Sequence, residues 1–563
     1  MSPDMQPRFY PPGLDVTWDM VLPRETLTQV LDATVAAHGD RPALEFMGRS
    51  WRYAELGDMV ARVAAGLRDL GVAPGDRVGL CLPNTHFFVA AYFGVLKAGA
   101  VVVNFSPLMV AEEMAVQAAD SGITVMLTLD LKPLLPRVLE VLQGEGPLRH
   151  VVVCHFAHCL PAVKSALFRL FRRASIGAAP ADDARISEFT ALIEAPPIAD
   201  PPAVTPESLA VLQYTGGTTG KPKGVMLTHA NLCANLRQVQ AWCGGSDHEQ
   251  ERMFAVIPFF HVFAMTTAMN VALAWGAEII MQPRYEKKLV LAAIHRRRPT
   301  ILPGVPTLFK ALLDHGATRE DLASVRICIS GGAPLPLALK HEFEAKSGAT
   351  LVEGYGLTEA SPVCFCNPVR GENREGTIGL PLPLMRAEIR SLEDPRRAMP
   401  TGERGELCVS GPNVMAGYWQ RPTDTAATLT PDGWLRTGDV GIMDADGYVA
   451  LVDRIKDLIL VSGFNVYPRA IEEVLYTHPD IAAATVLGMP DPRQGESPAA
   501  FIELKPGAVP DEAALRAFLK QHLSAIQMPK LIEFRPALPR TAVGKLSKKE
   551  LREELRTRLR EDA

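Results

Sequence analysis

Several patterns that mark other classes of protein are missing from this sequence of 563 residues. The nine cysteines follow no zinc-binding spacing, because the pair Cys364 and Cys366 has no second pair of cysteines or histidines at a suitable distance. Positive charge is not in excess, since 58 lysines and arginines stand against 63 aspartates and glutamates, for a net charge of −5. The composition therefore argues against a zinc module and against a nucleic-acid-binding protein.

A secretory signal and a membrane-spanning segment are not expected either. Residues 1–18 are rich in proline and aspartate and lack a basic stretch followed by an apolar one. The most apolar stretch, 87–103, is interrupted by Lys97, so we interpret it as a buried helix that turns at Gly99 into a strand. An odd number of cysteines in so long a chain is typical of reduced thiols, and we expect a cytoplasmic protein.

Short β-rich runs alternate with helical patterns over the first two thirds of the chain. Strands are expected at 77–82, 101–103, 124–129 and 150–154, and a helix is expected at 85–97. This alternation is typical of parallel α/β layers. The chain is also too long for one ordinary hydrophobic core, so two or more domains are expected.

After about residue 375 the pattern changes to short strands separated by dense turn signals. These signals lie at 401–405, 431–433 and 444–447. Their spacing indicates an antiparallel region. A last unit begins near Asp453 with a strand, a helix, another strand and a final helix rich in lysine and arginine. We therefore predict a large domain over residues 1–453 and a small C-terminal domain over 454–563.

Residues 162–174 have the pattern of an amphipathic helix with basic residues on its polar face. The apolar face carries Val163, Ala166, Leu167, Leu170 and Phe171, and the other face carries Ser165, Arg169, Arg172 and Arg173. Such a helix is typical of peripheral contact with an anionic membrane surface. The alternative is an ordinary surface helix whose apolar face packs on the core. The sequence leaves both interpretations open.

The strongest local signal is the glycine-rich segment YTGGTTGKPKG at 214–224, which follows an apolar run. Its glycines let backbone N–H groups approach phosphate oxygens, and its threonines and lysines add donors and positive charge. It is not a Walker A loop, because Thr215 stands where that pattern requires glycine and Pro222 stands where it requires serine or threonine. The segment therefore predicts polyphosphate binding on a fold other than that of the P-loop NTPases.

Further motifs follow along most of the chain. They are YTGGTTGKPKGVMLTH (214–229), GGAP (331–334), YGLTE (355–359), GWLRTGD (433–439), DRIKD (453–457) and PRTAVGK (539–545). In this order they resemble the acyl-adenylate-forming superfamily, which includes acyl-CoA synthetases, firefly luciferase and the adenylation domains of nonribosomal peptide synthetases. Within it, PFFHVFA (258–264) and LVSGFNVYPRAIEEVL (460–475) are most similar to bacterial long-chain fatty acyl-CoA ligases.

The resemblance implies an α/β fold with a large N-terminal domain of α/β layers plus a small β-barrel-like region, and a small mobile C-terminal α+β domain. It implies a ligase that activates a carboxylic acid as an acyl-adenylate at the expense of ATP and then transfers the acyl group to coenzyme A. ATP, Mg²⁺ and coenzyme A are the implied cofactor and co-substrates, and no nucleic-acid partner is expected. A homodimer and a peripheral membrane contact through 162–174 stay open.

By the same resemblance, the glycine-rich loop contacts the β- and γ-phosphates of ATP. The residues concerned are Thr215, Gly216, Gly217, Thr218, Thr219, Gly220, Lys221 and Lys223. Thr215 and Glu359 are expected to hold Mg²⁺, which prefers oxygen ligands and keeps waters and phosphate oxygens as its others. Tyr355 is expected to stack on adenine. The other implied nucleotide contacts are Gly332, Ala333, Gly354, Gly356 and Thr358.

The remaining implied roles concern the ribose, the reacting groups and the domain movement. Asp439 is expected to accept hydrogen bonds from the ribose hydroxyls, with Arg454 beside it. Lys545 is the implied catalytic residue, because a flexible ammonium can bridge the carboxylate and the α-phosphate. Lys456 is the implied hinge about which the small domain turns. The implied acyl and coenzyme A contacts are His261, which gates the acyl pocket, with Phe263, Gly331 and Gly463.

The sequence leaves the acid and the acceptor less well defined than the class of reaction. Apolar residues around His261 favour a medium- to long-chain fatty acid, with an aryl acid as the alternative. A carrier protein acting in trans, or a small amine, could replace coenzyme A as acceptor. A non-catalytic adenylate-binding protein is disfavoured, because Thr215, Glu359, Asp439 and Lys545 are all present.

Overall fold

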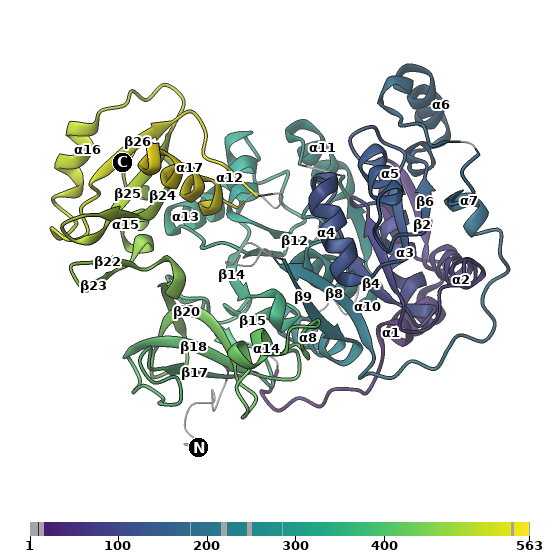
Figure 1. The fold of residues 1–563 in the computed structure, drawn as a ribbon, viewed down its shortest axis with the longest axis horizontal. Helices are drawn as coiled ribbons and strands as arrows, with labels where there is room; N and C mark the ends of the chain where they lie inside the picture. The colour runs from purple at the N-terminus through teal and green to yellow at the C-terminus, as the bar shows by residue number, and fades with distance from the viewer. Residues whose placement is uncertain are drawn as a thin grey trace.

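A computed structural model describes residues 10, 16–180, 182–215, 222–244, 250–283, 285–541 and 545–561. Figure 1 shows a large α/β body that carries most of the chain, and a smaller α+β part at one end that carries the C-terminus. No helix within the described ranges is both long enough and apolar enough to cross a bilayer. The predicted fold class, α/β with a large N-terminal and a small C-terminal part, is confirmed.

The first sheet of the large body is mostly parallel. In spatial order it comprises β19 (Gly417–Tyr418), β9 (Lys223–Thr228), β8 (Leu209–Thr215), β4 (Val101–Asn104), β3 (Arg77–Cys81), β5 (Val125–Leu129), β6 (His150–Cys154) and β7 (Ile186–Glu188). The helices α3 (His86–Lys97), α4 (Ala111–Ser121) and α5 (Leu135–Gln143) connect successive parallel strands from β3 to β6. This β-α-β succession confirms the alternation that the sequence predicts. The apolar stretch 87–103 forms α3 and β4, with Gly99 at φ +78° between them.

The second sheet packs in the same body. Its strands in spatial order are β16 (Leu380–Pro381), β15 (Val363–Cys366), β14 (Leu351–Gly356), β13 (Ile327–Gly331), β12 (Ile301–Gly304), β10 (Arg252–Ala255), β11 (Glu278–Met281), β1 (Pro42–Phe46) and β2 (Arg49–Arg52). The accompanying helices include α1 (Leu27–His38), α2 (Tyr53–Asp69), α8 (His229–Cys243), α10 (Val271–Ala274), α11 (Lys287–Arg297), α12 (Pro306–Asp314) and α13 (Leu337–Ser347). One continuous apolar core joins both sheets, so they form a single body.

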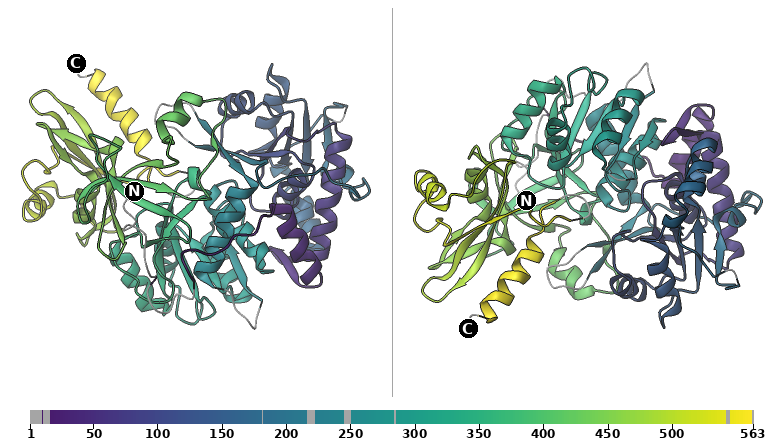
Figure 2. Two further views of the ribbon diagram at one scale, coloured as in Figure 1. Left: turned by 90° about the horizontal axis from the view of Figure 1, so that it is seen from below. Right: turned by 90° about the horizontal axis from the view of Figure 1, so that it is seen from above.

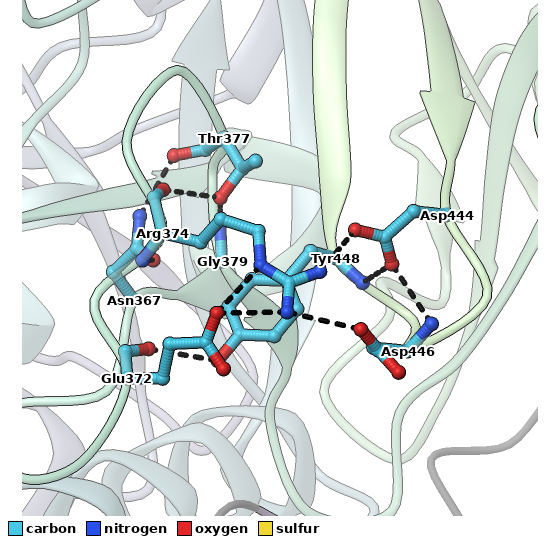
Figure 3. A network of polar contacts seen from close by, with 8 residues as sticks. All are labelled: Asn367, Glu372, Arg374, Thr377, Gly379, Asp444, Asp446 and Tyr448. Atoms are coloured by element: carbon cyan, nitrogen blue, oxygen red, sulfur yellow. Dashed lines mark hydrogen bonds and ion pairs between the residues drawn. The ribbon is translucent and has the colours of Figure 1, made fainter.

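A small antiparallel sheet follows, as the turn signals predict. It comprises β17 (Arg386–Arg390), β18 (Arg404–Ser410), β20 (Leu435–Met443) and β21 (Val449–Arg454), with α14 (Pro422–Thr428) between β19 and β20. The network in Figure 3 holds its β20–β21 turn against the segment that follows β15. There Arg374 pairs with Asp444 and Asp446 of the turn and with Glu372, and its guanidinium lies 4.1 Å from the centre of the Tyr448 ring. The small sheet is therefore tied to the large body by charge as well as by packing.

The C-terminal part has its own sheet and its own apolar cores. Its strands are β22 (Ile459–Val461), β23 (Phe464–Val466), β24 (Ile481–Asp491), β25 (Gly495–Leu504) and β26 (Leu531–Arg535), and its helices are α15 (Pro468–Tyr476), α16 (Glu512–Leu519) and α17 (Lys548–Glu561). In both views of Figure 2, α17 projects from the body at the C-terminal end. The short η6 (Ile455–Asp457) joins β21 to β22. The predicted boundary between 453 and 454 lies just before η6 and stays a prediction.

Candidate active site

A cleft with a volume of about 670 Å³ is lined by residues from the large body, the small antiparallel sheet and the C-terminal part. It brings together most of the residues that the sequence predicts for a site. Those that line it are Thr215, Lys223, His261, Phe263, Gly331, Gly332, Gly354, Tyr355, Gly356, Thr358, Glu359, Asp439, Arg454, Lys456 and Lys545. Gly216, Gly217, Thr218, Thr219, Gly220 and Lys221 lie outside the described residues.

The ends of two paired strands fix the base of the glycine-rich segment. Strands β8 and β9 are antiparallel, and Thr215 lies opposite Lys223 in their register. The Lys223 ammonium lies 2.6 Å from Asp424 Oδ1 of α14 and 5.2 Å from the centre of the Tyr418 ring. A hydroxyl and an ammonium are thus contributed to the lining of the cleft by two paired positions, where they suit an anionic group.

Glu359 is held by a tyrosine that the sequence analysis gave no role. The Tyr418 hydroxyl donates to Glu359 Oε1 over 2.8 Å, and the Met415 N–H donates to the Glu359 carbonyl over 2.8 Å. Tyr418 belongs to β19, which pairs with β9 and so places the phenol beside the carboxylate. No sequence motif linked positions 359 and 418, because only the strand pairing brings them together.

Three of the predicted residues form a chain of contacts in the cleft. The Tyr355 hydroxyl donates to Asp439 Oδ2 over 2.5 Å, and Arg454 Nε lies 3.1 Å from Asp439 Oδ1. Asp439 and Arg454 face each other in the register of β20 and β21. Burial, with the Asp439 charge, raises the pKa of Tyr355, so the phenol stays neutral. The arrangement fixes the tyrosine ring in the cleft with a carboxylate beside it.

Lys545 reaches the cleft from the C-terminal part and lies against the backbone of Gly332. A Cβ added at Gly332, which has φ +78°, would lie 2.8 Å from Lys545 Cε, so a side chain at this position would make the end of the lysine shift. Burial, together with the charge of Arg454, lowers the pKa of Lys545 to about 8. The Thr541 N–H donates to the Lys545 carbonyl over 2.7 Å.

Part of the lining of the cleft is apolar, and it includes Val239, Trp242, Val262, Phe263, Ile329, Val363 and Leu382. A Cβ at Gly331 would lie 2.8 Å from Phe263 Cζ, so a glycine at this position avoids a clash with the Phe263 ring. Burial and the Lys545 charge lower the pKa of His261 to about 3, which leaves its imidazole neutral. His261 caps the helix α9 (Val262–Ala264), which continues into a π-helix, η4 (Met265–Asn270), a form that is frequent at functional sites.

Two predicted residues are not among those that line the cleft. Ala333 follows Gly332 but is not part of the wall. Gly463, with φ +85°, lies at the exposed tip of the β22–β23 hairpin, and a Cβ there would meet no atom within 4 Å. Lys456 does line the cleft, and it is the exposed residue of η6. A site for coenzyme A that includes Gly463 is therefore not assembled in this arrangement of the two parts.

The metal prediction rests on few protein ligands. Within the described ranges, no group of three or more histidine, cysteine, aspartate or glutamate side chains could hold a metal ion. Thr215 and Glu359 line the same cleft, and Tyr418 engages only one oxygen of the Glu359 carboxylate. Two oxygen ligands fit Mg²⁺, which completes its octahedron with water and phosphate oxygens.

The fold and the cleft define a nucleotide-binding protein whose site is shared between a large body and a small C-terminal part. The pattern of the AMP-binding enzyme family matches residues 31–419, and that of the AMP-binding enzyme C-terminal domain matches residues 470–545. The chain belongs to this family.

Relatives with assigned activities match almost the whole chain. A long-chain-fatty-acid–CoA ligase of Bacillus subtilis is 40% identical over 544 residues, which are 96% of this chain and 96% of that protein. The enzyme of the same name from Escherichia coli O6:H1 is 37% identical over 94% of this chain and 95% of its own length. A feruloyl-CoA synthase of Amycolatopsis is 36% identical over 92% of this chain and 95% of its own length.

Solved structures of similar fold cover almost the whole chain. The ATP-bound MatB of Rhodopseudomonas palustris superposes with a TM-score of 0.81 at 28% identity and covers 94% of this chain and 99% of its own. The anthranilate CoA ligase AuaEII in complex with anthranoyl-AMP gives 0.82 at 27% identity, over 95% of this chain and 98% of its own.

Proposed function

We propose that this chain joins a medium- to long-chain fatty acid to coenzyme A, at the expense of ATP, through an acyl-adenylate. One observation carries the proposal. Lys545 of the C-terminal part lies against the Gly332 backbone in a cleft that is lined by Thr215 and Glu359 and also by a set of apolar side chains. A carboxylate at the end of an apolar chain and the α-phosphate of ATP would meet at this lysine.

In the first half-reaction two anions must approach each other, so positive charge at their meeting point lowers the barrier. The Lys545 ammonium supplies this charge, and Lys223 supports the outer phosphates. Asp439 and Tyr355 orient the nucleoside. Thr215 and Glu359 would hold Mg²⁺, which neutralises phosphate charge when it is bound.

In the second half-reaction the thiol of coenzyme A attacks the carbonyl carbon of the acyl-adenylate and AMP leaves, so the site has to change. We place the hinge at Lys456, because η6 joins parts that have separate apolar cores. Rotation there would withdraw Lys545 and bring the β22–β23 hairpin to the cleft. Gly463 at its tip would then leave room for the thiol arm of coenzyme A.

The fatty-acid part of the proposal is supported by the apolar side chains of the cleft and by the relatives that act on long-chain fatty acids. Each methylene of such an acid favours a bilayer over water by about 0.8 kcal/mol. Peripheral contact with a membrane, where the acid concentrates, is therefore part of the proposal.

The experiment measures acid-dependent pyrophosphate release and acyl-CoA formation over a panel of fatty and aryl acids. Lys545→Ala should abolish pyrophosphate release but still form thioester from supplied acyl-adenylate and coenzyme A. Lys549→Ala, which removes an exposed lysine of α17, is the matched control and should behave as the wild type.

Other outcomes would contradict parts of the proposal. If only aryl acids are turned over, the substrate is an aryl acid and not a fatty acid, an outcome that agrees with the similarity to a feruloyl-CoA synthase. Pyrophosphate release without acyl-CoA would mean that the acceptor is a carrier protein or an amine. Equal pyrophosphate release by wild type and Lys545→Ala would remove the catalytic role of this lysine.

A further inference from the structure

The helix α6 (Ala162–Phe171) turns its apolar face to solvent. Val163 is 74% exposed, Leu167 49%, Leu170 71% and Phe171 73%, and no residue of the helix is buried. The first three recur at the spacing of one helical stripe, and Phe171 lies beside it. The alternative of a surface helix packed on the core through this face is therefore wrong. Large apolar side chains gathered in this way mark an interaction surface.

The opposite side of α6 fastens the helix to the body. The centre of the Phe168 ring lies 5.0 Å from the centre of the Phe156 ring, and the Lys164 ammonium donates to the Met47 carbonyl over 2.7 Å. The segment that follows the helix is held where the Lys132 N–H donates to the Ser175 carbonyl over 2.9 Å. The helix is thus fixed at both ends with its apolar stripe facing outward.

The charge next to this stripe is positive. Arg169, Arg172 and Arg173 are exposed, and none of them has an ion-pair partner in the part of the chain that the structure describes. The helix and the turn η3 (Arg173–Ser175) contain no acidic residue. A second copy of the chain would set the same arginines face to face in a two-fold interface, which like charges oppose.

We propose that α6 is a docking surface for an anionic phospholipid bilayer. Val163, Leu167, Leu170 and Phe171 enter the boundary between headgroups and acyl chains, and the three arginines contact lipid phosphates. This pairing of an apolar stripe with flanking arginines is what an interfacial helix requires.

The place of α6 in the fold suits such docking. Figure 1 shows it at the end of the molecule opposite α16 and the rest of the C-terminal part. A bilayer bound there would leave the C-terminal part free to turn about η6. Docking would supply the enzyme with an acid that is held in the membrane, and this benefit rests on the proposed function. The docking itself needs no substrate.

Flotation with vesicles tests the surface directly. The full-length wild type should float with phosphatidylcholine vesicles that contain about one third phosphatidylglycerol, far less with pure phosphatidylcholine, and less as salt rises. Replacing Arg169, Arg172 and Arg173 together by glutamine should weaken binding about a hundredfold. Leu170→Ser with Phe171→Ser should weaken it about tenfold or more.

Matched controls distinguish binding through α6 from the general effect of removing positive charge or an exposed apolar side chain. Replacing Arg24, Lys346 and Arg396 by glutamine removes the same charge from exposed positions elsewhere, and Val509→Ser removes an exposed apolar side chain. Both controls should bind vesicles as the wild type does. The proposal is overturned if the control variants lose vesicle binding as the α6 variants do. It is equally overturned if the wild type does not bind anionic vesicles. It is also overturned if light scattering shows that the wild type is a dimer and that the α6 variants are monomers.

A turnover assay distinguishes a failure of the docking proposal from a failure of the proposed function. The α6 variants should keep the wild-type unfolding temperature and the wild-type rate with a short, water-soluble acid. With a long-chain acid presented in anionic vesicles their rate should fall in parallel with flotation. Flotation without ligase activity would refute the proposed function and leave the docking surface standing.

Discussion

The low pKa of Lys545 predicts how acyl-adenylate formation depends on pH. Burial and the Arg454 charge lower this pKa to about 8, and the protonated ammonium is the form that neutralises phosphate charge. The free enzyme therefore loses its active form as the pH rises through about 8. Above that value kcat/KM should fall about tenfold per pH unit, whereas a lysine of ordinary pKa would hold a plateau to about pH 10.

Lys545→Arg isolates this effect. A guanidinium stays protonated across the range, so the fall on the basic side should disappear even though the rate drops, because the larger planar head fits poorly against Gly332. The assay is acid-dependent pyrophosphate release, with kcat/KM for ATP followed from about pH 6 to about pH 10. Lys549→Arg serves as the control and should keep the wild-type profile.

Two results would refute this reasoning. A wild-type plateau that extends to about pH 10 would mean that Lys545 is not buried in the free enzyme in solution. A fall at the same pH in Lys545→Arg would assign the titration to another group.

Two further substitutions probe the cleft. Gly332→Ala should lower the rate of adenylate formation at least about tenfold, because its Cβ would displace Lys545. Pyrophosphate release measures this effect. Tyr418→Phe removes a hydrogen bond to the Glu359 carboxylate, a contact worth about 1.5–3 kcal/mol. The Mg²⁺ concentration for half-maximal pyrophosphate release should therefore rise about tenfold or more.

Controls for both exist in the chain. Gly402→Ala tests the backbone cost alone, since Gly402 has φ +84° and open space around it, and it should lower stability but not the rate. Tyr448→Phe removes a hydroxyl that donates to the Glu372 carbonyl outside the cleft, and it should leave the Mg²⁺ dependence unchanged. A loss of rate in Gly402→Ala equal to that in Gly332→Ala would contradict the first prediction. An unchanged Mg²⁺ dependence in Tyr418→Phe would contradict the second.

Local patterns in the sequence located many elements of the fold. The strand predicted at 150–154 is β6, and the helix predicted at 85–97 is α3, shorter by one residue at its start. Such elements depend on residues a few positions apart, which the sequence displays directly. The resemblance also selected residues from six separated motifs, most of which line one cleft. Their individual chemical roles stay predictions.

Contacts between distant segments were not visible in the sequence. Tyr418 holds Glu359 only because β19 pairs with β9, and nothing near either residue signals that pairing. The prediction for Gly463 depends on how the C-terminal part is turned, and in this arrangement its hairpin tip lies outside the cleft.

By itself the sequence determined the α/β class, the family motifs and the amphipathic character of 162–174, because each follows from the order of nearby residues. Only the tertiary structure decided which side of that helix is covered, since the same periodicity fits an apolar face turned inward or outward. Phe168 fastens α6 to the body, and Leu170 on the exposed stripe faces solvent. The tertiary structure likewise decided that Lys545 meets Gly332, because segments far apart in the chain share a wall only after the two parts have packed together.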